Sequence, residues 1–331
     1  MSAHATQLHA ALFAGWLAAL AFVPAAGAAE TQWTPTRPLR YVIAFPPGGT
    51  SDLLARAMAP GMGEGLGQPL VLDNRGGAGG IVAMEAVARA PRDGYTFGIA
   101  SLSSHAANAT LALKLPYDSI KDFEPITLLG RSPLLLVVPP TNTASTLKEL
   151  LTQAKAKSRS LNFASPGVGL ASHIASELLK IQAQADMVHV PYKGGGPALA
   201  DVVAGHVDMM FIPISSAMPL VQGGRLRALT IVRKERSPRL PNVPTIAESG
   251  YANFEIAEWW GLLAPAGTLP TATRRLRTEA IRALQRPDVA ERLSAAGVEV
   301  ITSTPEELRA YIVAEIKKYR EIIQRAGIKP N

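Results

Sequence analysis

A glycine turn early in the chain carries the residue types of an anion-binding loop. The turn follows an apolar run, 39–45, that predicts a buried strand, and it reads Phe45-Pro46-Pro47-Gly48-Gly49-Thr50-Ser51-Asp52. Strong helix formers follow from Leu53, and Thr50 or Ser51 is placed to cap that helix. The two glycines let the backbone turn sharply. A helix start of this kind presents unpaired N–H groups and the positive end of the helix dipole, which favour a carboxylate or a phosphate.

Two later loops have the same design. Pro166-Gly167-Val168-Gly169 and Gly194-Gly195-Gly196 each follow a predicted strand and open a predicted helix. The first loop lacks both the Gly-Lys-Ser/Thr of a P-loop and the Gly-x-Gly-x-x-Gly of a dinucleotide site. A single junction of this kind in an α/β protein is most often a plain connection. Together, on two facing lobes, they would hold both ends of an elongated dianion, and this is the interpretation we prefer.

Serine and histidine side chains supply a second set of candidates. Ser101 and Ser103 stand where a predicted strand ends, and they either contact a ligand or cap a helix expected to begin near Ala106. Ser165 and His173 allow an alternative in which a hydrolase uses them as nucleophile and base on the same cleft. The neighbours Ser104-His105 and Ser172-His173 also suggest a hydrolase, but adjacent residues do not by themselves make a nucleophile–base pair, and the chain has no Gly-x-Ser-x-Gly elbow.

Other catalytic and metal signatures are weak. His189 is read as an ordinary strand residue, and Lys193 lies in a glycine-flanked turn that is poorly suited to a Schiff-base lysine. The chain contains no His-Glu-x-x-His and no cysteine, which excludes a disulfide framework and a cysteine metal site. We therefore expect no metal, no cofactor and no catalysis.

The elements that position these loops alternate between strand and helix. This order predicts an α/β fold with mainly parallel sheets flanked by helices. We expect two lobes, residues 36–132 plus 257–331 and residues 133–256, with crossovers near Pro133 and Trp259 that act as a hinge. Everything after Thr271 is expected to be helical, and the last helix carries an apolar face.

Composition and the N-terminus indicate an exported protein. Residues 10–23 are apolar and too short to span a bilayer comfortably, and the small residues 25–29 follow them, which predicts a signal peptide over 1–29, cleaved after Ala28 or Ala29. We therefore expect the mature protein in the periplasm. The net charge of +7 is spread along 331 residues without a basic block, so we expect no nucleic-acid partner.

The motifs, taken together, resemble those of the tripartite tricarboxylate transporter substrate-binding receptors, or Bug-type periplasmic solute receptors. The resemblance runs from about Pro38 to the C-terminus and includes the first glycine turn. Further matching segments are Gly67-Gln68, Asn74-Arg75-Gly76-Gly77-Ala78-Gly79-Gly80, Asp93-Gly94-Tyr95-Thr96, Leu115-Pro116-Tyr117-Asp118, Lys121-Asp122-Phe123-Glu124-Pro125, Ser165-Pro166-Gly167-Val168-Gly169 with His173, Val190-Pro191-Tyr192-Lys193-Gly194-Gly195, Val243-Pro244-Thr245, Glu248-Ser249-Gly250, and Trp260-Gly261-Leu262 with Ala264-Pro265.

This resemblance implies a monomeric, two-lobed receptor that closes on a small carboxylate and delivers it to membrane transporter subunits. One end of the ligand would be lined by Phe45, Gly48, Gly49, Thr50 and Asp52. The rest would be lined by Ser101, Ser103, Ser165, Gly169, His173, Tyr192, Lys193 and Gly194. One departure concerns the ligand's distal part: relatives often carry a polar pair where this chain has Ile212-Pro213, which suggests a less polar ligand tail.

Overall fold

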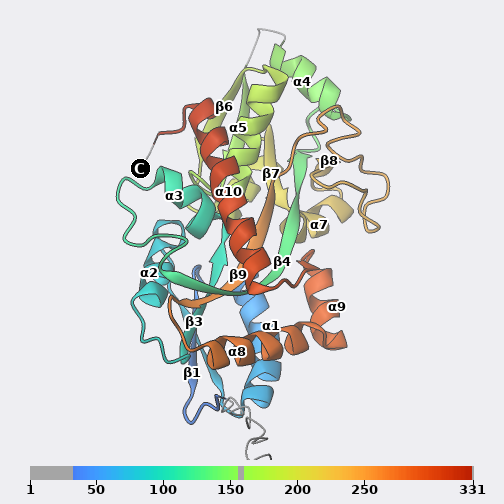
Figure 1. Ribbon diagram of the computed structural model, residues 1–331. Helices are drawn as coiled ribbons and strands as arrows, with labels where there is room; N and C mark the ends of the chain where they lie inside the picture. Colours follow the sequence, from blue (N-terminus) through green and yellow to red (C-terminus); the bar gives the residue numbers. More distant parts are fainter. Residues whose placement is uncertain (1–32, 156–159, 330–331) are drawn as a thin grey trace, which may run out of the picture. The chain divides into compact units, whose positions relative to one another are not determined.

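The computed structural model describes residues 33–155 and 160–329 (Figure 1). The predicted signal peptide, residues 1–29, lies outside this range. Within it, no helix has the length and apolar character needed to cross a membrane.

Strands and helices alternate through most of the described chain. The strands are β1 (Leu39–Ile43), β2 (Leu70–Asn74), β3 (Thr96–Ser101), β4 (Phe123–Val138), β5 (Leu161–Ser165), β6 (Met187–Pro191), β7 (Met209–Pro213), β8 (Arg227–Ile231), β9 (Ala257–Pro265) and β10 (Glu299–Val300). The α-helices are α1 (Thr50–Leu66), α2 (Ile81–Ala88), α3 (Asn108–Leu111), α4 (Leu147–Lys155), α5 (Ala171–Ala183), α6 (Gly195–Ala204), α7 (Ile214–Gln222), α8 (Pro270–Leu284), α9 (Pro287–Ala295) and α10 (Pro305–Ala326). A 3₁₀ turn, η1 (Ala78–Gly80), precedes α2, and a π-helix, η2 (Leu102–Ala107), precedes α3.

The strands form two sets that share β4. The order is β2-β1-β3-β9-β4-β7-β5-β6, with β8 and β10 also paired to β4. Parallel pairs β1–β2, β1–β3, β5–β6 and β5–β7 lie on the two sides, as the βα alternation predicts. The first part of β4, Phe123–Pro133, pairs with β9, while Leu134–Val138 pairs with β7 and β8. The chain thus passes between the two sets in β4 and returns in β9, although the exact lobe boundaries stay a prediction.

Strand β4 is much longer than the sequence suggested. Its apolar end, Leu134–Val138, was expected, but the strand already begins at Phe123 and includes Pro125 and Pro133. Proline cannot donate a ladder hydrogen bond, so it argues against a central strand. Here the pairing with β9 shifts register between Pro125 and Thr127, and such an irregularity accommodates the missing donor.

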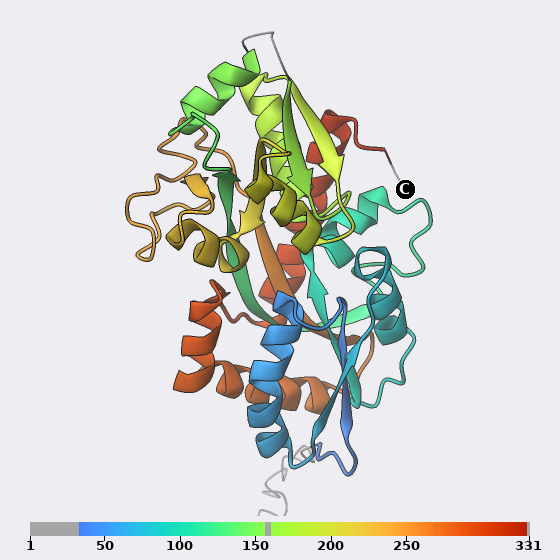
Figure 2. The same cartoon turned by 180° about the vertical axis from the view of Figure 1, so that it is seen from behind.

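Three clusters of buried side chains hold the elements together. One packs α1, α8 and α9 on β1 and β9, and another packs α6 and α7 on the second part of β4, on β7 and on β8. The largest lies under α10, which contacts η2, β4 and α5 and so touches elements of both strand sets (Figures 1 and 2). Leu308, Ile312 and Tyr319 are buried there, which confirms the predicted apolar face of the last helix.

Two expectations about individual elements are wrong. The region after Thr271 is not entirely helical, because Val300 of β10 pairs with Gly130 of β4. The helix expected near Ala106 begins earlier, as the π-helix that starts at Leu102. Short elements such as β10 owe their conformation to a partner strand, which a local pattern does not reveal.

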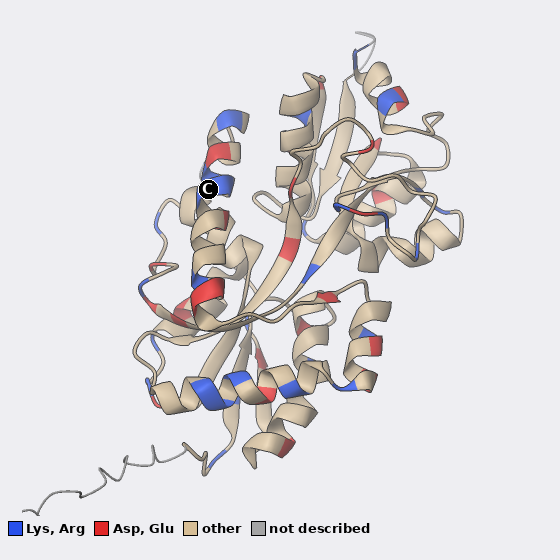
Figure 3. Ribbon diagram, turned by 45° about the vertical axis from the view of Figure 1, so that its right-hand side comes forward, with Lys and Arg blue, Asp and Glu red and all other residues tan. Residues whose placement is uncertain are grey.

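Basic residues lie on many elements and are interspersed with acidic ones (Figure 3). On α8 two arginines have a structural role: Arg275 Nη2 donates to the Gly65 carbonyl at 2.5 Å, and Arg282 Nη2 donates to the Gly61 carbonyl at 2.9 Å. These bonds fasten α8 to α1. The arginines of α8 therefore contribute to packing as well as to the net charge.

Candidate ligand-binding site

The β1–α1 turn ends in a helix start with no side-chain cap. Gly49 is the N-cap residue, in extended conformation at φ −81° and ψ 171°, and as a glycine it has no side chain to cap the first turn of α1. The expectation that Thr50 or Ser51 caps the helix is therefore wrong, because both residues are already inside α1. Gly48 has φ +90°, a conformation that side-chain-bearing residues rarely adopt. The first-turn N–H groups of α1 consequently stand next to an exposed glycine loop.

Asp52 organises this turn from within. Its Oδ2 accepts from the Gly48 N–H at 3.0 Å and from Arg56 Nε at 2.8 Å, and its Oδ1 accepts from Asn74 Nδ2 at 3.1 Å. Burial acts to raise the pKa of Asp52, but the hydrogen bonds from Arg56, Gly48 and Asn74 outweigh it, and the pKa lies below its ordinary value. Asp52 is thus an ionised, buried side chain that holds the loop.

The turn after β2 lies directly against the β1–α1 loop. Asn74 Nδ2 donates to the Phe45 carbonyl at 3.0 Å, and the Arg75 N–H donates to the Ile43 carbonyl at 2.8 Å. A Cβ added to Gly76 would lie 3.1 Å from the Pro46 ring, so the two segments approach closely. The glycine-rich stretch 74–80 therefore supports the first loop.

At the end of β3, serine hydroxyls cap a helix. Ser101 Oγ accepts from the Ser104 N–H at 3.4 Å, and Ser104 Oγ accepts from the Ser101 N–H at 2.9 Å, which forms a capping box at the start of η2. Ser103 Oγ donates to the Gly79 carbonyl at 3.2 Å. Ser101 and Ser103 are both buried. Of the two roles left open by the sequence, capping is the one observed for Ser101.

In the second strand set, Ser165 contacts His189, which was not among the predicted ligand-binding residues. Ser165 Oγ lies 2.6 Å from His189 Nε2 and donates to the Gly167 carbonyl at 3.0 Å. The His189 ring stacks on His173 at 3.9 Å between centroids and on Phe163 at 5.0 Å. Burial lowers the pKa of His189 to about 4, so its ring is neutral at neutral pH.

His173 is a loop anchor. Its Nδ1 accepts from the Gly169 N–H at 3.1 Å. A backbone N–H can only donate, so neutral His173 carries its proton on Nε2, which faces Glu177 Oε1 at 3.9 Å. Burial, with lesser contributions from His189 and Lys180, lowers the pKa of His173 to about 3. The single lone pair of the neutral ring is thereby already occupied.

The β6–α6 turn lies beside the β5–α5 loop. The Tyr192 N–H donates to the Ser165 carbonyl at 2.9 Å, and the Gly194 N–H donates to the Pro166 carbonyl at 2.9 Å. The Tyr192 hydroxyl donates to Asp201 Oδ2 at 2.6 Å, and burial raises the pKa of this tyrosine to about 12. Lys193 is exposed, and Gly194, at φ 113°, is the uncapped N-cap of α6.

The predicted residues thus fall into two groups. The first group consists of Phe45, Gly48, Gly49, Thr50, Asp52, Ser101 and Ser103. The serines belong to it because Ser103 Oγ donates to the carbonyl of Gly79, in the stretch that supports the β1–α1 loop. The second consists of Ser165, Gly169, His173, Tyr192, Lys193 and Gly194. The β5–α5 loop also touches α3, because Gly169 approaches Leu111 so closely that an added Cβ would lie 2.4 Å from the leucine side chain.

His189 belongs to the second group, and the sequence held a signal for it. Met187, His189 and Pro191 alternate along one strand, which places them on one face. In parallel register His189 pairs with Phe163, two residues before Ser165. Alternation in the sequence indicates the face on which this imidazole lies, but its place beside β5 depends on the register of the two strands.

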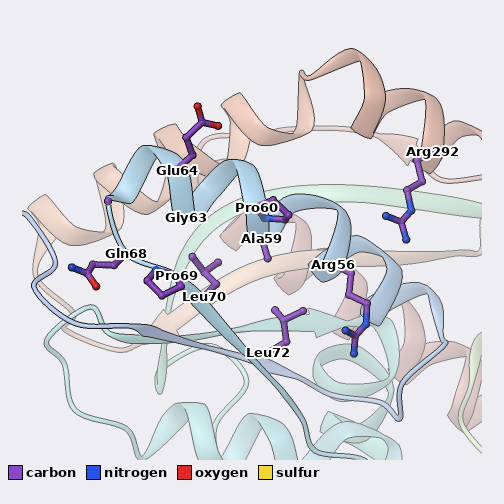
Figure 4. Close-up of a pocket in the computed structure, with 11 residues that line it drawn as sticks. Arg56, Ala59, Pro60, Gly63, Glu64, Gln68, Pro69, Leu70, Leu72 and Arg292 are labelled. Atoms are coloured by element: carbon purple, nitrogen blue, oxygen red, sulfur yellow. The ribbon is translucent and has the colours of Figure 1, made fainter.

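A cavity of about 760 Å³ lies between α1, β2 and α9 (Figure 4). Arg56 and Arg292 both line it, and Leu70 and Leu72 contribute apolar surface. A second cavity of about 530 Å³ lies beside Glu124 and the first turns of α10. Neither cavity is lined by a residue predicted to bind the ligand. Among residues 33–155 and 160–329, no three histidine or acidic side chains cluster as metal ligands would.

Comparison with known proteins decides the family. The sequence profile of the tripartite tricarboxylate transporter family receptors matches residues 54–328. The chain belongs to this family. It is therefore a receptor of the periplasmic solute-binding type, as the sequence motifs had indicated.

Individual relatives agree with this assignment. BugT of Bordetella pertussis is 35% identical over 316 residues, which cover 95% of this chain and 96% of BugT. The solved structure of Rpa4515 of R. palustris with adipate has a TM-score of 0.82 at 33% identity and covers 90% of this chain and 99% of that one. MatC of Rhodopseudomonas palustris with bound malate has a TM-score of 0.78 at 35% identity, covering 87% and 99%. These structures confirm the predicted two-lobed α/β fold of a periplasmic binding protein.

Proposed function

We propose that this receptor binds a small organic dicarboxylate between its two lobes and delivers it to membrane transporter subunits. In this proposal the mature protein is a periplasmic monomer, released by cleavage of the signal peptide over residues 1–29. The ligand is bound and released unchanged, without a cofactor or a metal.

The observation that carries the proposal is the uncapped start of α1 at an exposed glycine loop. First-turn N–H groups of a helix need acceptors, and a carboxylate supplies them with favourable charge. Helices α5 and α6 also begin without side-chain caps, at the carboxyl ends of β5 and β6. Charge-assisted bonds of this kind contribute roughly 1.5–3 kcal/mol each, so a few are enough for micromolar affinity.

The ligands of two relatives support the same class. Rpa4515 was solved with adipate and MatC with malate, both of which carry two carboxylates. In our proposal one carboxylate lies at Gly49 and Thr50, and the other end lies near the loops that carry Ser165 and Gly194. The lobes rotate around the strands β4 and β9, with residues 36–132 plus 257–331 in one lobe and 133–256 in the other.

A hydrolase remains the second candidate, favoured by the 2.6 Å contact between Ser165 and His189. The pairing with His173 that we first considered lacks a free base, because the lone pair of His173 accepts from Gly169. Ser165 is fully buried, and the Gly167 carbonyl competes for its only proton. This arrangement favours a structural serine over a nucleophile.

A thermal-shift screen of mono-, di- and tricarboxylates on the mature protein tests the proposal. We expect adipate-like or malate-like acids to raise the melting temperature in a saturable manner, as RT ln(1 + [L]/Kd) requires. Calorimetry then gives Kd, and mass analysis of the recovered ligand checks that it is unchanged. Absence of any stabilising carboxylate would overturn the proposal, and turnover lost on Ser165→Ala would favour the hydrolase.

A further inference from the structure

We propose that Asp52, Arg56 and Asn74 form a positioning cluster for the carboxylate-binding loop, in which Arg56 cancels the charge of Asp52 beside the bound anion. This inference rests on the proposed function. Asp52 then shapes the loop, in place of the direct ligand contact that the family resemblance implied. Arg56 and Asn74 are two further residues of the site that were not predicted.

Asp52 is unsuited to touch an anionic ligand. Its side chain is 4% exposed, and both carboxylate oxygens accept from donors of the chain itself. An ionised carboxylate has no proton to donate, so it cannot hydrogen-bond a second carboxylate. Its bond to the Gly48 N–H instead draws that amide towards the interior and fixes the left-handed conformation of Gly48.

Asn74 completes the clamp from the neighbouring strand. Its Nδ2 donates both to the Phe45 carbonyl, before the glycines, and to Asp52 Oδ1, after them. One amide group therefore ties together the two ends of the turn. Because the Gly48 N–H already donates to Asp52, the N–H groups that are available to the ligand are those of the first turn of α1.

The clamp places a negative charge in the first turn of the helix that receives the anion. Arg56, one helical turn further along α1, compensates for this charge through its 2.8 Å bond to Asp52. The Arg56 side chain is half exposed and borders the cavity between α1, β2 and α9 (Figure 4). A methionine at position 56 therefore has room to replace the arginine without disturbing the core.

The test uses the dicarboxylate that binds the wild-type protein best in the screen above. We expect Arg56→Met to weaken its binding about tenfold, because Asp52 is then an uncompensated charge near the ligand. The double variant Asp52→Asn with Arg56→Met is expected to recover part of the affinity, because the charge is gone but the single amide oxygen can accept from only one of Gly48 N–H and Asn74 Nδ2. Arg89→Met is the matched control, since Arg89 forms a similar i,i+4 ion pair with Glu85 on α2, at 2.7 Å.

A pH series separates the charge effect from simple loosening of the loop. Relative to wild type at the same pH, the affinity of Arg56→Met should rise as the pH falls from 7 to 5, because ligand protonation affects both proteins alike whereas protonation of Asp52 removes a repulsion that exists only in the variant. The double variant and Arg89→Met should not show this rise. Asn74→Ala should weaken binding at every pH.

Outcomes for this cluster and for the proposed function are distinguishable. Wild-type binding with unchanged affinity in Arg56→Met and Asn74→Ala would overturn the cluster alone. Equal losses in Arg56→Met and in the double variant, both independent of pH, would overturn the charge-compensating role. If the wild-type protein binds no carboxylate, the cluster falls together with the function on which it rests.

Discussion

Ser165 Oγ, at the end of β5, lies 2.6 Å from Nε2 of His189, in the middle of the parallel strand β6. The His189 ring stacks on both His173 and Phe163, so its orientation towards the serine is set by stacking. This relationship orders the β5–α5 loop, which in our proposal meets the distal end of the ligand. The first two predictions concern the two ends of that site.

His189→Phe preserves the stack but removes the contact with Ser165. We expect ligand affinity to fall several-fold, as calorimetry would show.

The same variant should change how stability depends on pH. The pKa values of His189 and His173 in the folded protein, about 4 and about 3, lie below the unfolded value near 6.5. Their contribution to stability is therefore present above pH 6.5 and is lost as the pH falls towards 4. Urea unfolding from pH 7 to 4.5 should therefore show a shallower loss of stability in His189→Phe.

Gly49→Ala and Gly49→Val test the proposed carboxylate contact at α1. Gly49 has a negative φ, and an added Cβ would find only the Pro46 carbonyl oxygen, at 3.8 Å, so the fold should tolerate both changes. We expect affinity to fall with side-chain size, by about tenfold or more for valine, which corresponds to about 1.4 kcal/mol. The free energy of unfolding should not fall for alanine. Normal binding by the valine variant would place the carboxylate elsewhere.

Glu258→Gln should stabilise the protein at alkaline pH. Burial and the nearby Glu315 raise the pKa of Glu258 to about 8, above the unfolded value. The stabilisation that comes with the protonated form is present at low pH and is lost as the pH rises through 8. We expect the variant to gain about 1 to 3 kcal/mol over wild type at pH 8.5 and little at pH 5. Glu255→Gln, at an exposed neighbour, should gain nothing, and equal gains at both pH values would contradict the assignment.

Arg239→Ala should loosen the contact between the loop after β8 and α9. Arg239 Nη1 donates to the carbonyls of Ser294 and Ala295, at 2.9 and 2.8 Å, at the C-terminus of α9. We expect the radius of gyration of the ligand-free protein to increase in small-angle scattering, because this bond links parts of the two proposed lobes. Arg236→Ala removes a comparable arginine that pairs with Glu248 inside the same loop. If neither variant expands, the bond does not restrain the lobes.

The end of β7 should influence which acid binds best. Ile212 is buried in the core, so of the pair Ile212-Pro213 only the partly buried Pro213 can face a ligand. We expect acids with an apolar middle, such as adipate, to bind more tightly than malate. Pro213→Asn should reduce this preference, and asparagine is well suited to the N-cap position of α7 that Pro213 occupies. A strong wild-type preference for malate, measured by calorimetry, would refute the idea of an apolar tail.

Local patterns were sufficient for most of the order of strands and helices, with β10 and η2 as exceptions, and for the three glycine turns. The run 39–45, the glycines after it and the helix formers from Leu53 specify a strand, a turn and a helix through neighbours in the chain alone. The family motifs are likewise contiguous segments, which is why the two-lobed α/β receptor fold was predictable. The apolar face of α10 follows from a spacing of three and four residues.

Side-chain partners were decided only by the tertiary structure. Ser165 meets His189 rather than His173 because β5 and β6 pair in parallel register, and no spacing in the sequence encodes that register. Asp52 meets Asn74 because β2 lies beside β1, which turns an apparent ligand contact into a clamp on the loop. A sequence states which groups are available, but hydrogen bonds depend on distances of about 3 Å between atoms that the fold alone brings together.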